Sequence, residues 1–197
     1  THSQEPSSLS LERARVPAPS NHEGRRAEFC LNWLKSQGAR DVYIDQALNV
    51  VYPADVRQDG PLDVFMAHMD VVFSDETELP LRVEDGRIYC PGVGDDTACL
   101  VCLLMAGKYI ARHVDSPRWR EIRGEDAPGL LLVCNAGEEG LGNRKGVRKI
   151  CEDYGGRTKS FCTFDSSLSS IVYRAVGAKR FCVNVHNQGR HHYIDFG

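Results

Sequence analysis

Seven side chains that are able to bind a metal ion lie in four short stretches of this 197-residue sequence. They are one histidine and six acids: His68, Asp70, Asp95, Asp96, Glu138, Glu139 and Asp165. Taken singly, each stretch has an ordinary explanation, such as a hydrogen-bonded pair, a helix N-terminus or a solvated turn. Taken together, the acids would repel one another unless a cation lay among them. The residue types therefore indicate metal-dependent hydrolysis, since nitrogen and carboxylate ligands suit Zn²⁺.

The spacing of the glutamates fits a site of this kind. Two zinc ions that share one carboxylate lie about 3.5–4 Å apart in hydrolytic sites, where they lower the pKa of a bound water. A further carboxylate that is not a ligand must then take the proton from that water. The adjacent Glu138 and Glu139 are able to divide these roles, one as the base and the other as a ligand.

The segments that would position these acids alternate between strands and helices. Apolar runs predict strands over residues 61–73, 129–140 and 160–167, and helical patterns lie between them over residues 95–113 and 143–156. A helix is expected over residues 20–38, with a capping box between Ser20 and Glu23. One or two strands are expected over 41–54, a hairpin turning at Asp85–Gly86, and two strands over 171–188. Residues 114–128 are expected to form a loop.

This order predicts an α/β fold, with a mostly parallel, mixed sheet flanked by helices. Candidate ligands follow the apolar part of each of these three runs. They are His68 and Asp70 after LDVFMA, Glu138 and Glu139 after LLLVCNA, and Asp165 after SFCTF. In open α/β sheets, ligands bind at the carboxyl ends of the strands. The sequence therefore places these groups at one edge of one sheet.

Composition argues against several classes of partner. The net charge is -3 and the basic residues form no stripe with interleaved aromatics, so we expect no nucleic-acid binding. No apolar run is long enough to span a membrane, and the polar segment THSQEPSSLSLERARVPAPS lacks the apolar core of a signal peptide. Most of the eight cysteines lie in apolar or alternating segments, where we expect buried, reduced thiols. These features predict a cytoplasmic protein.

Five stretches resemble, in order, the motifs of one enzyme family. They are AHMDVV, GVGDDTACL, AGEEGLGN, TFD and GRHHYIDFG. The family is that of the zinc-dependent exopeptidases and deacylases, which include peptidase T, carboxypeptidase G, aminoacylase and acetylornithine deacetylase, and the chain is most similar to the peptidase T-like members. The resemblance implies a catalytic α/β domain, of which residues 1–175 form the N-terminal part. It also implies an inserted α+β lid domain whose first strands lie in residues 176–197.

Carried over position by position, the resemblance implies a site for two zinc ions, with Co²⁺ or Mn²⁺ as alternative ions. His68 and Asp165 match ligands of the first zinc. Asp95 matches the carboxylate that bridges both ions, and Glu139 matches a ligand of the second. Asp96 is then a neighbour of the site rather than a ligand.

The resemblance also implies roles for three residues that do not bind the metal. Asp70 matches the acid that orients the first histidine ligand, Glu138 matches the general base, and His191 matches the lid histidine that holds the substrate. The usual lid pattern Gly-Gly-His-Ser is replaced by GRHH in this chain, so Arg190 and His192 depart from the family.

The activity implied is that of a zinc-dependent metallopeptidase that hydrolyses di- or tripeptides, with homodimer formation through the lid domain. Two alternatives remain open. A deacylase of N-acyl amino acids uses the same metals and the same base. An inactive fragment or scaffold would lack the family's last zinc ligand, a histidine that lies downstream of the position where this sequence ends, at Gly197. We therefore expect residues 1–197 alone to be inactive.

Overall fold

The computed structural model describes residues 16–56, 59–73, 79–165, 170–174, 177, 181, 183 and 184. His191, most of the two strands expected over residues 171–188, and most of the lid domain expected from residue 176 lie outside these ranges. No helix within the described ranges is long and apolar enough to cross a membrane.

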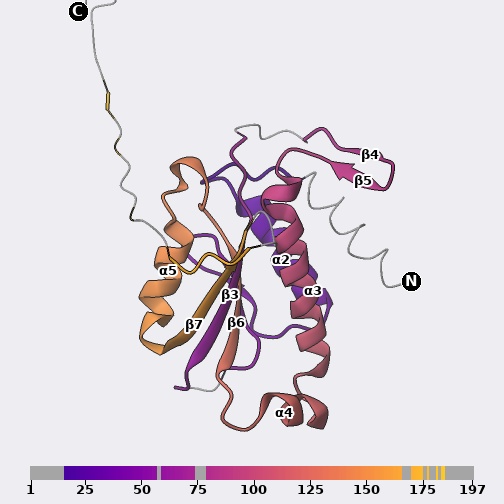
Figure 1. Ribbon diagram of the computed structural model, residues 1–197, viewed down its shortest axis with the longest axis vertical. Helices are drawn as coiled ribbons and strands as arrows, with labels where there is room; N and C mark the ends of the chain where they lie inside the picture. Colours follow the sequence, from indigo (N-terminus) through magenta and orange to yellow (C-terminus); the bar gives the residue numbers. More distant parts are fainter. Residues whose placement is uncertain are drawn as a thin grey trace, which may run out of the picture.

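A five-stranded sheet, in the order β1-β2-β6-β3-β7, forms the centre of the fold (Figure 1). β3 (Leu62–His68) lies between β6 (Gly129–Asn135) and β7 (Thr158–Phe164) and is parallel to both. β2 (Val50–Pro53) pairs antiparallel with β6, and β1 (Tyr43–Ile44) pairs antiparallel with β2. The expected mixed α/β sheet is therefore confirmed.

Alternate side chains of the strands pack against helices on opposite faces of the sheet. α2 (Gly24–Ser36) and α3 (Ala98–His113) cover one face, and α5 (Lys145–Tyr154) covers the other (Figure 1). All of β6 is buried, with Leu132 in the core beneath α2 and α3 and Leu131 in the core beneath α5. Burial on both faces explains the continuous apolar run in this part of the sequence, because such a strand has no polar face.

The hairpin expected at Asp85–Gly86 is confirmed. β4 (Arg82–Glu84) pairs antiparallel with β5 (Arg87–Tyr89), and both turn residues have positive φ, of 49° and 73°. A tight hairpin needs this left-handed backbone, which asparagine, aspartate and glycine adopt most readily. The hairpin stands away from the five-stranded sheet (Figure 1).

The loop expected over residues 114–128 contains a short helix, α4 (Pro117–Arg123). The Ser116 hydroxyl accepts a hydrogen bond from the backbone N–H of Trp119 at 3.2 Å, and Pro117 occupies the first helical position. Both are start signals for a helix, because serine satisfies an N–H with no helical partner and proline needs none. The prediction was wrong because the prolines were interpreted only as helix breakers.

The helix expected from Asp95 begins instead at Ala98. Residues Val93–Thr97 form a single wide turn in which Asp95 and Asp96 leave helical geometry, with φ of -133° and -129°, and the peptide bond between them is cis. Both carboxylates are directed at His68, Asp95 at its ring and Asp96 at its backbone N–H. The expected helix start was wrong because these long-range contacts are incompatible with a helical backbone at the two acids.

α2 begins close to the expected position but without the expected capping box. The Glu23 carboxylate accepts the backbone N–H of Asn21 at 2.8 Å, and no side chain caps the first turn. The Ser20 hydroxyl is directed at Asp70 rather than at the helix. The prediction failed because Ser20 contacts the distant Asp70 and Glu23 also pairs with the distant Lys145.

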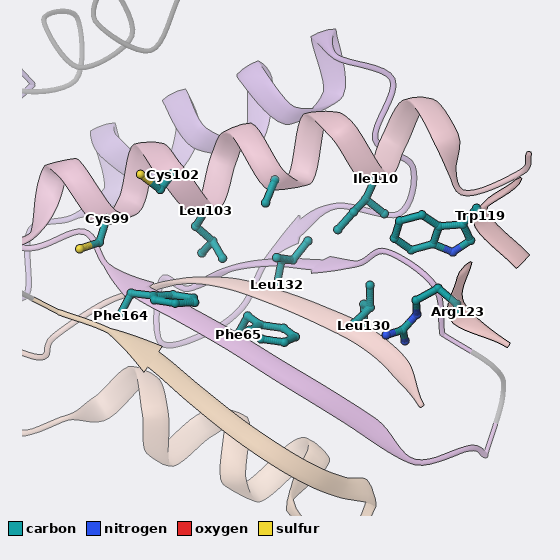
Figure 2. Close-up of a pocket in the computed structure, with 11 residues that line it drawn as sticks. Phe65, Cys99, Cys102, Leu103, Ile110, Trp119, Arg123, Leu130, Leu132 and Phe164 are labelled. Atoms are coloured by element: carbon teal, nitrogen blue, oxygen red, sulfur yellow. The ribbon is translucent and has the colours of Figure 1, made fainter. Parts of the chain in front are cut away.

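β7 lies at an edge of the sheet, and most of its side chains are exposed. Cys162, which we expected to be buried, is exposed for this reason, and Phe161 is 43% exposed. An apolar groove of about 460 Å³ lies beside β7, between α3 and the sheet (Figure 2). Phe65 and Phe164 line it and stack with ring centroids 6.4 Å apart. No disulfide bond joins the cysteines within the described ranges, and Cys102, which we also expected to be buried, is exposed.

Candidate metal centre

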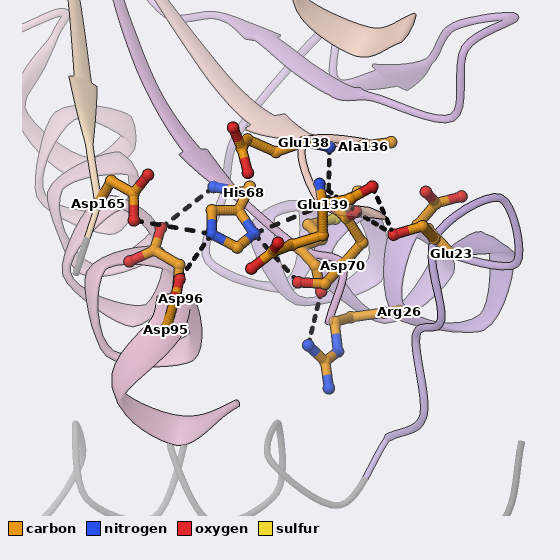
Figure 3. A network of polar contacts seen from close by, with 12 residues as sticks. Glu23, Arg26, His68, Asp70, Asp95, Asp96, Ala136, Glu138, Glu139 and Asp165 are labelled. Carbon is orange, nitrogen blue, oxygen red and sulfur yellow. Dashed lines mark hydrogen bonds and ion pairs between the residues drawn. The ribbon is translucent and has the colours of Figure 1, made fainter. Parts of the chain in front are cut away.

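His68, the last residue of β3, is the central side chain of the site and is 3% exposed. Its Nδ1 atom lies 3.0 Å from the backbone carbonyl oxygen of Asp70. Its Nε2 atom lies 3.0 Å from Oδ1 of Asp95 and 3.9 Å from Oδ1 of Asp165 (Figure 3). A carbonyl oxygen only accepts hydrogen bonds, so Nδ1 carries a proton and Nε2 is the atom that faces the acids.

Asp70 is fully buried and joins the loops that follow β3 and β6. Its Oδ1 accepts the backbone N–H of Glu138 at 3.0 Å, and its Oδ2 accepts that of Glu139 at 2.9 Å and the Ser20 hydroxyl at 2.7 Å. Burial would raise the pKa of Asp70, but the hydrogen bonds from His68, Ser20 and the two amides lower it overall. Asp70 is therefore an ionised carboxylate that holds the N–H groups of the glutamate pair, while its backbone carbonyl oxygen contacts Nδ1 of His68.

The candidate ligands come together in two groups that share His68. One group is His68, Asp95 and Glu139, and the other is His68, Glu138 and Asp165. Within each group, the three ligand atoms lie within 4.8 Å of one another. Glu138, which we expected to act as the base, thus also lies within 4.8 Å of the histidine ligand atom.

Three separate elements carry these groups to the same edge of the sheet. Glu138 and Glu139 follow β6, and Asp165 follows β7, so both loops leave the sheet at the carboxyl ends of strands parallel to β3. Asp95 reaches the same place from the wide turn before α3. The predicted convergence is therefore present at the carboxyl ends of the strands, where open α/β sheets bind ligands.

The local electrostatics reflect a concentration of negative charge. Burial would lower the pKa of His68, but its contacts with Asp70, Asp96 and Asp95 raise it to about 10. Burial and the charge of Asp95 both raise the pKa of Glu139. A divalent cation would neutralise this charge and compete with the proton on Nε2. One imidazole and four carboxylates form a donor set that fits zinc.

Asp96 lies beside the site but belongs to neither group of ligands. It is 1% exposed, and its Oδ2 accepts the backbone N–H of His68 at 3.1 Å. Burial raises its pKa to about 7, against the lowering effects of Cys99 and His68. Asp96 therefore holds the end of β3, in agreement with its interpretation as a neighbour of the metal site.

Three residues near the site, Ser20, Glu23 and Lys145, were not among the expected site residues. Ser20 hydrogen-bonds to Asp70, and Glu23 pairs with Lys145 at 2.8 Å. Glu23 is fully buried, although a glutamate before a helix ordinarily points into solvent. The signal that was available, serine followed by glutamate three residues later, suggested a helix cap instead. His191, the expected substrate-binding residue, lies outside the described residues.

The chain is similar to known proteins both in its sequence family and in its fold. The family model described as Peptidase family M20/M25/M40 matches residues 64–169, and no curated protein sequence matches the chain. Among solved structures, the aminopeptidase PepT from Bacillus cereus is 17% identical, with a TM-score of 0.56 over 83% of this chain and 43% of that one. The Bacillus subtilis YXEP protein, described as a dinuclear metal binding peptidase, is 13% identical, with a TM-score of 0.58 over 84% of this chain and 44% of that one.

A tripeptidase from Staphylococcus aureus is 21% identical, with a TM-score of 0.50 over 68% of this chain and 36% of that one. The chain thus spans about two fifths of the length of these three structures, and the likeness to them concerns the fold. The family model covers more than half of the chain, and its range contains every residue from His68 to Asp165. By this match the chain belongs to the Peptidase family M20/M25/M40.

Proposed function

We propose that the chain carries most of the metal site of a zinc-dependent metallopeptidase that cleaves short peptides of two or three residues. One observation carries the proposal, namely the convergence of one histidine and four carboxylates at the carboxyl ends of parallel strands. The charges of these carboxylates repel one another, and a cation among them would relieve this repulsion. Membership of a peptidase family supports the assignment to peptide bonds.

The proposed ligands are assigned to two ions. His68 and Asp165 would hold the first, Asp95 would serve as a ligand of both, and Glu139 would hold the second, with Co²⁺ or Mn²⁺ as alternatives to zinc. Ions in such a site polarise the carbonyl of the scissile bond and make water more acidic. The Oδ1 atoms of Asp95 and Asp165, at 3.0 Å and 3.9 Å from Nε2 of His68, support the placement of these three side chains around the first ion.

Glu138 is proposed as the general base. Its carboxylate takes a proton from the attacking water and delivers it to the nitrogen of the departing amine. Asp70 supports this role because it fixes the backbone N–H groups of both Glu138 and Glu139, and thereby the direction of both side chains. Asp70 also holds the Nδ1 proton of His68, so that Nε2 remains the atom available to a metal.

Further parts of the proposal concern residues near the end of the sequence. Residues 1–175 form the N-terminal part of the catalytic domain, and residues 176–197 open a lid domain. His191 in this lid binds the substrate, and the lid forms the contact of a homodimer. A deacylase of N-acyl amino acids is the alternative, and it differs in the substrate rather than in the metal site.

The test is metal binding followed by substrate comparison. Zn²⁺ should bind the wild-type chain and should not bind H68A at the same concentration. Where turnover is measurable, a tripeptide with a free amino terminus should be cleaved faster than an N-acetyl amino acid. A folded wild-type chain that binds no zinc at micromolar concentrations would contradict the proposal. Faster cleavage of the N-acetyl amino acid would instead favour the deacylase.

A further inference from the structure

The segment that precedes α2 contacts both loops that carry the candidate ligands. The backbone N–H of Val71 donates to the carbonyl oxygen of Ala18 at 2.9 Å, and Pro19 pairs with Val71 as an isolated bridge. Arg26, in the first turn of α2, connects this segment to the same loop, because it donates from Nε to the carbonyl oxygen of Val16 at 3.0 Å and from Nη1 to that of Met69 at 2.6 Å. This segment is thus attached to the loop after β3 on both sides of Asp70.

Ser20 lies between the two loops. Its hydroxyl oxygen is 2.7 Å from Oδ2 of Asp70, in the loop after β3, and 3.0 Å from the carbonyl oxygen of Glu139, in the loop after β6. The two partners are far from it in sequence, at separations of 50 and 119 residues. One hydroxyl group therefore spans the junction at which the histidine loop meets the glutamate loop.

An ion pair attaches the same segment to the start of α5, which follows the glutamate loop. Glu23 accepts from Nζ of Lys145 at 2.8 Å, and the glutamate is fully buried. The stem of Lys145 passes against Gly137, where a Cβ atom would lie 2.7 Å from its Cγ. Gly137 also has a φ of 67°, so a larger residue there would be strained as well as crowded. The lysine can reach Glu23 only because this position lacks a side chain.

We propose that Ser20 is a positioning residue of the metal centre, which sets the placement of Glu139 by joining its backbone carbonyl to the Asp70 carboxylate. This role rests on the proposed function, since it presumes a metal among the ligands. The single hydroxyl proton of Ser20 is shared between the two acceptors, and the Glu139 carbonyl also accepts the backbone N–H of Gly142 at 2.9 Å. Without the hydroxyl, this carbonyl keeps only the Gly142 donor, and Asp70 keeps only the backbone N–H groups on that side. The Glu139 carboxylate is then held less firmly relative to His68, and affinity for the metal falls.

The experiment titrates Co²⁺ into the full 197-residue chain and follows its visible absorption bands, which report the ligand geometry. S20A removes the hydroxyl, and S20T restores it on a similar side chain. S160A is the matched control, because the Ser160 hydroxyl also donates to a carboxylate, that of Asp63 at 2.6 Å, between β7 and β3. Loss of a residue that supports a metal ligand typically costs about 10- to 100-fold in metal affinity.

We expect S20A to bind Co²⁺ at least about tenfold more weakly with altered absorption bands, and S20T and S160A to bind as the wild type does. If S20A is too unstable to titrate, S20C carries the test, since a thiol has a similar shape and donates weakly, and it should show the same loss in smaller measure. Unchanged affinity in S20A, or an equal loss in S160A, would overturn the role of Ser20. Absence of Co²⁺ binding by the wild type would overturn the metal site itself.

Discussion

The Nε2 atom of His68 and the Oδ1 atom of Asp95 lie 3.0 Å apart, although 27 residues separate them in the sequence. The neighbouring Asp96 contacts the same histidine only through the backbone, at 3.1 Å. The two adjacent acids thus contact different parts of the histidine. Asp95 contacts its ring, and Asp96 accepts its backbone N–H.

This relationship predicts different effects of two isosteric changes. Asp95→Asn should reduce the zinc content of the dialysed protein strongly, because the bridging carboxylate serves both proposed ions. Asp96→Asn should retain most of the zinc, because its amide oxygen still accepts the His68 N–H. Atomic absorption on both variants makes the comparison. A greater zinc loss in Asp96→Asn would move the bridging role from Asp95 to Asp96.

The two glutamates predict a second contrast. Glu138→Ala should bind zinc almost as the wild type does, yet lower the rate of peptide hydrolysis by about two to four orders of magnitude wherever turnover is measurable, because general-base catalysis is lost. Glu139→Ala should weaken zinc binding instead. Zinc titration and a peptide assay on the same preparations separate the two effects. Equal zinc loss in both variants would show that both glutamates are ligands.

The buried Asp96 predicts a pH dependence of stability in the metal-free protein. Its pKa in the folded chain, about 7, lies above its ordinary value of 3.8, so the folded state holds the proton more tightly than the unfolded state does. The contribution of Asp96 to stability is therefore greatest below pH 3.8 and is lost as the pH rises through about 7. Asp96→Asn stays neutral throughout.

Urea unfolding in the presence of a chelator checks this dependence. The free energy of unfolding of Asp96→Asn, relative to that of the wild type, should increase between pH 4.5 and pH 8. A difference that is constant with pH would mean that Asp96 titrates normally in the folded chain.

Gly146 predicts a packing effect at the start of α5. A Cβ atom at this position would lie 2.3 Å from the side-chain oxygens of both Asn49 and Asn135. Gly146→Ala should therefore lower the free energy of unfolding by about 1–3 kcal/mol, because the crowded groups must move. Gly24→Ala is the control, since nothing lies within 4 Å of its added atom at the start of α2. Equal stability of both variants in urea would contradict the close packing.

The distribution of proposed ligands predicts the zinc content of residues 1–197. His68, Asp95 and Asp165 supply three ligands to one ion, whereas the other ion has only Asp95 and Glu139, without a nitrogen ligand. We expect one tightly bound zinc per chain and negligible peptide hydrolysis, since a zinc site with three protein ligands is a common arrangement and one with two is weak. Native mass spectrometry at limiting zinc measures the content. Two tightly bound ions, with turnover, would contradict the assignment.

Much of the fold and most of the site were predictable from contiguous residues. The apolar run of β6 predicted a strand buried on both faces, and Glu138 and Glu139 directly after it predicted acids at the edge of a sheet. The hairpin at Asp85–Gly86 was predictable because the turn residues themselves favour the required backbone. In each case the determining information lies within a few residues of the feature.

Tertiary structure alone decided the roles of side chains that have two uses. The sequence position of Ser20 suggested a helix cap, but its hydroxyl donates to Asp70. The sequence position of Asp96 suggested a helical residue, but its carboxylate accepts the backbone N–H of His68. The run of β7 resembles that of a buried strand, yet β7 lies at the sheet edge with Phe161 partly exposed. A local pattern specifies what a side chain is able to bind. Which partner it binds depends on the packing of loops that are distant in the sequence, and a buried polar group takes the partner that this packing brings within hydrogen-bond distance.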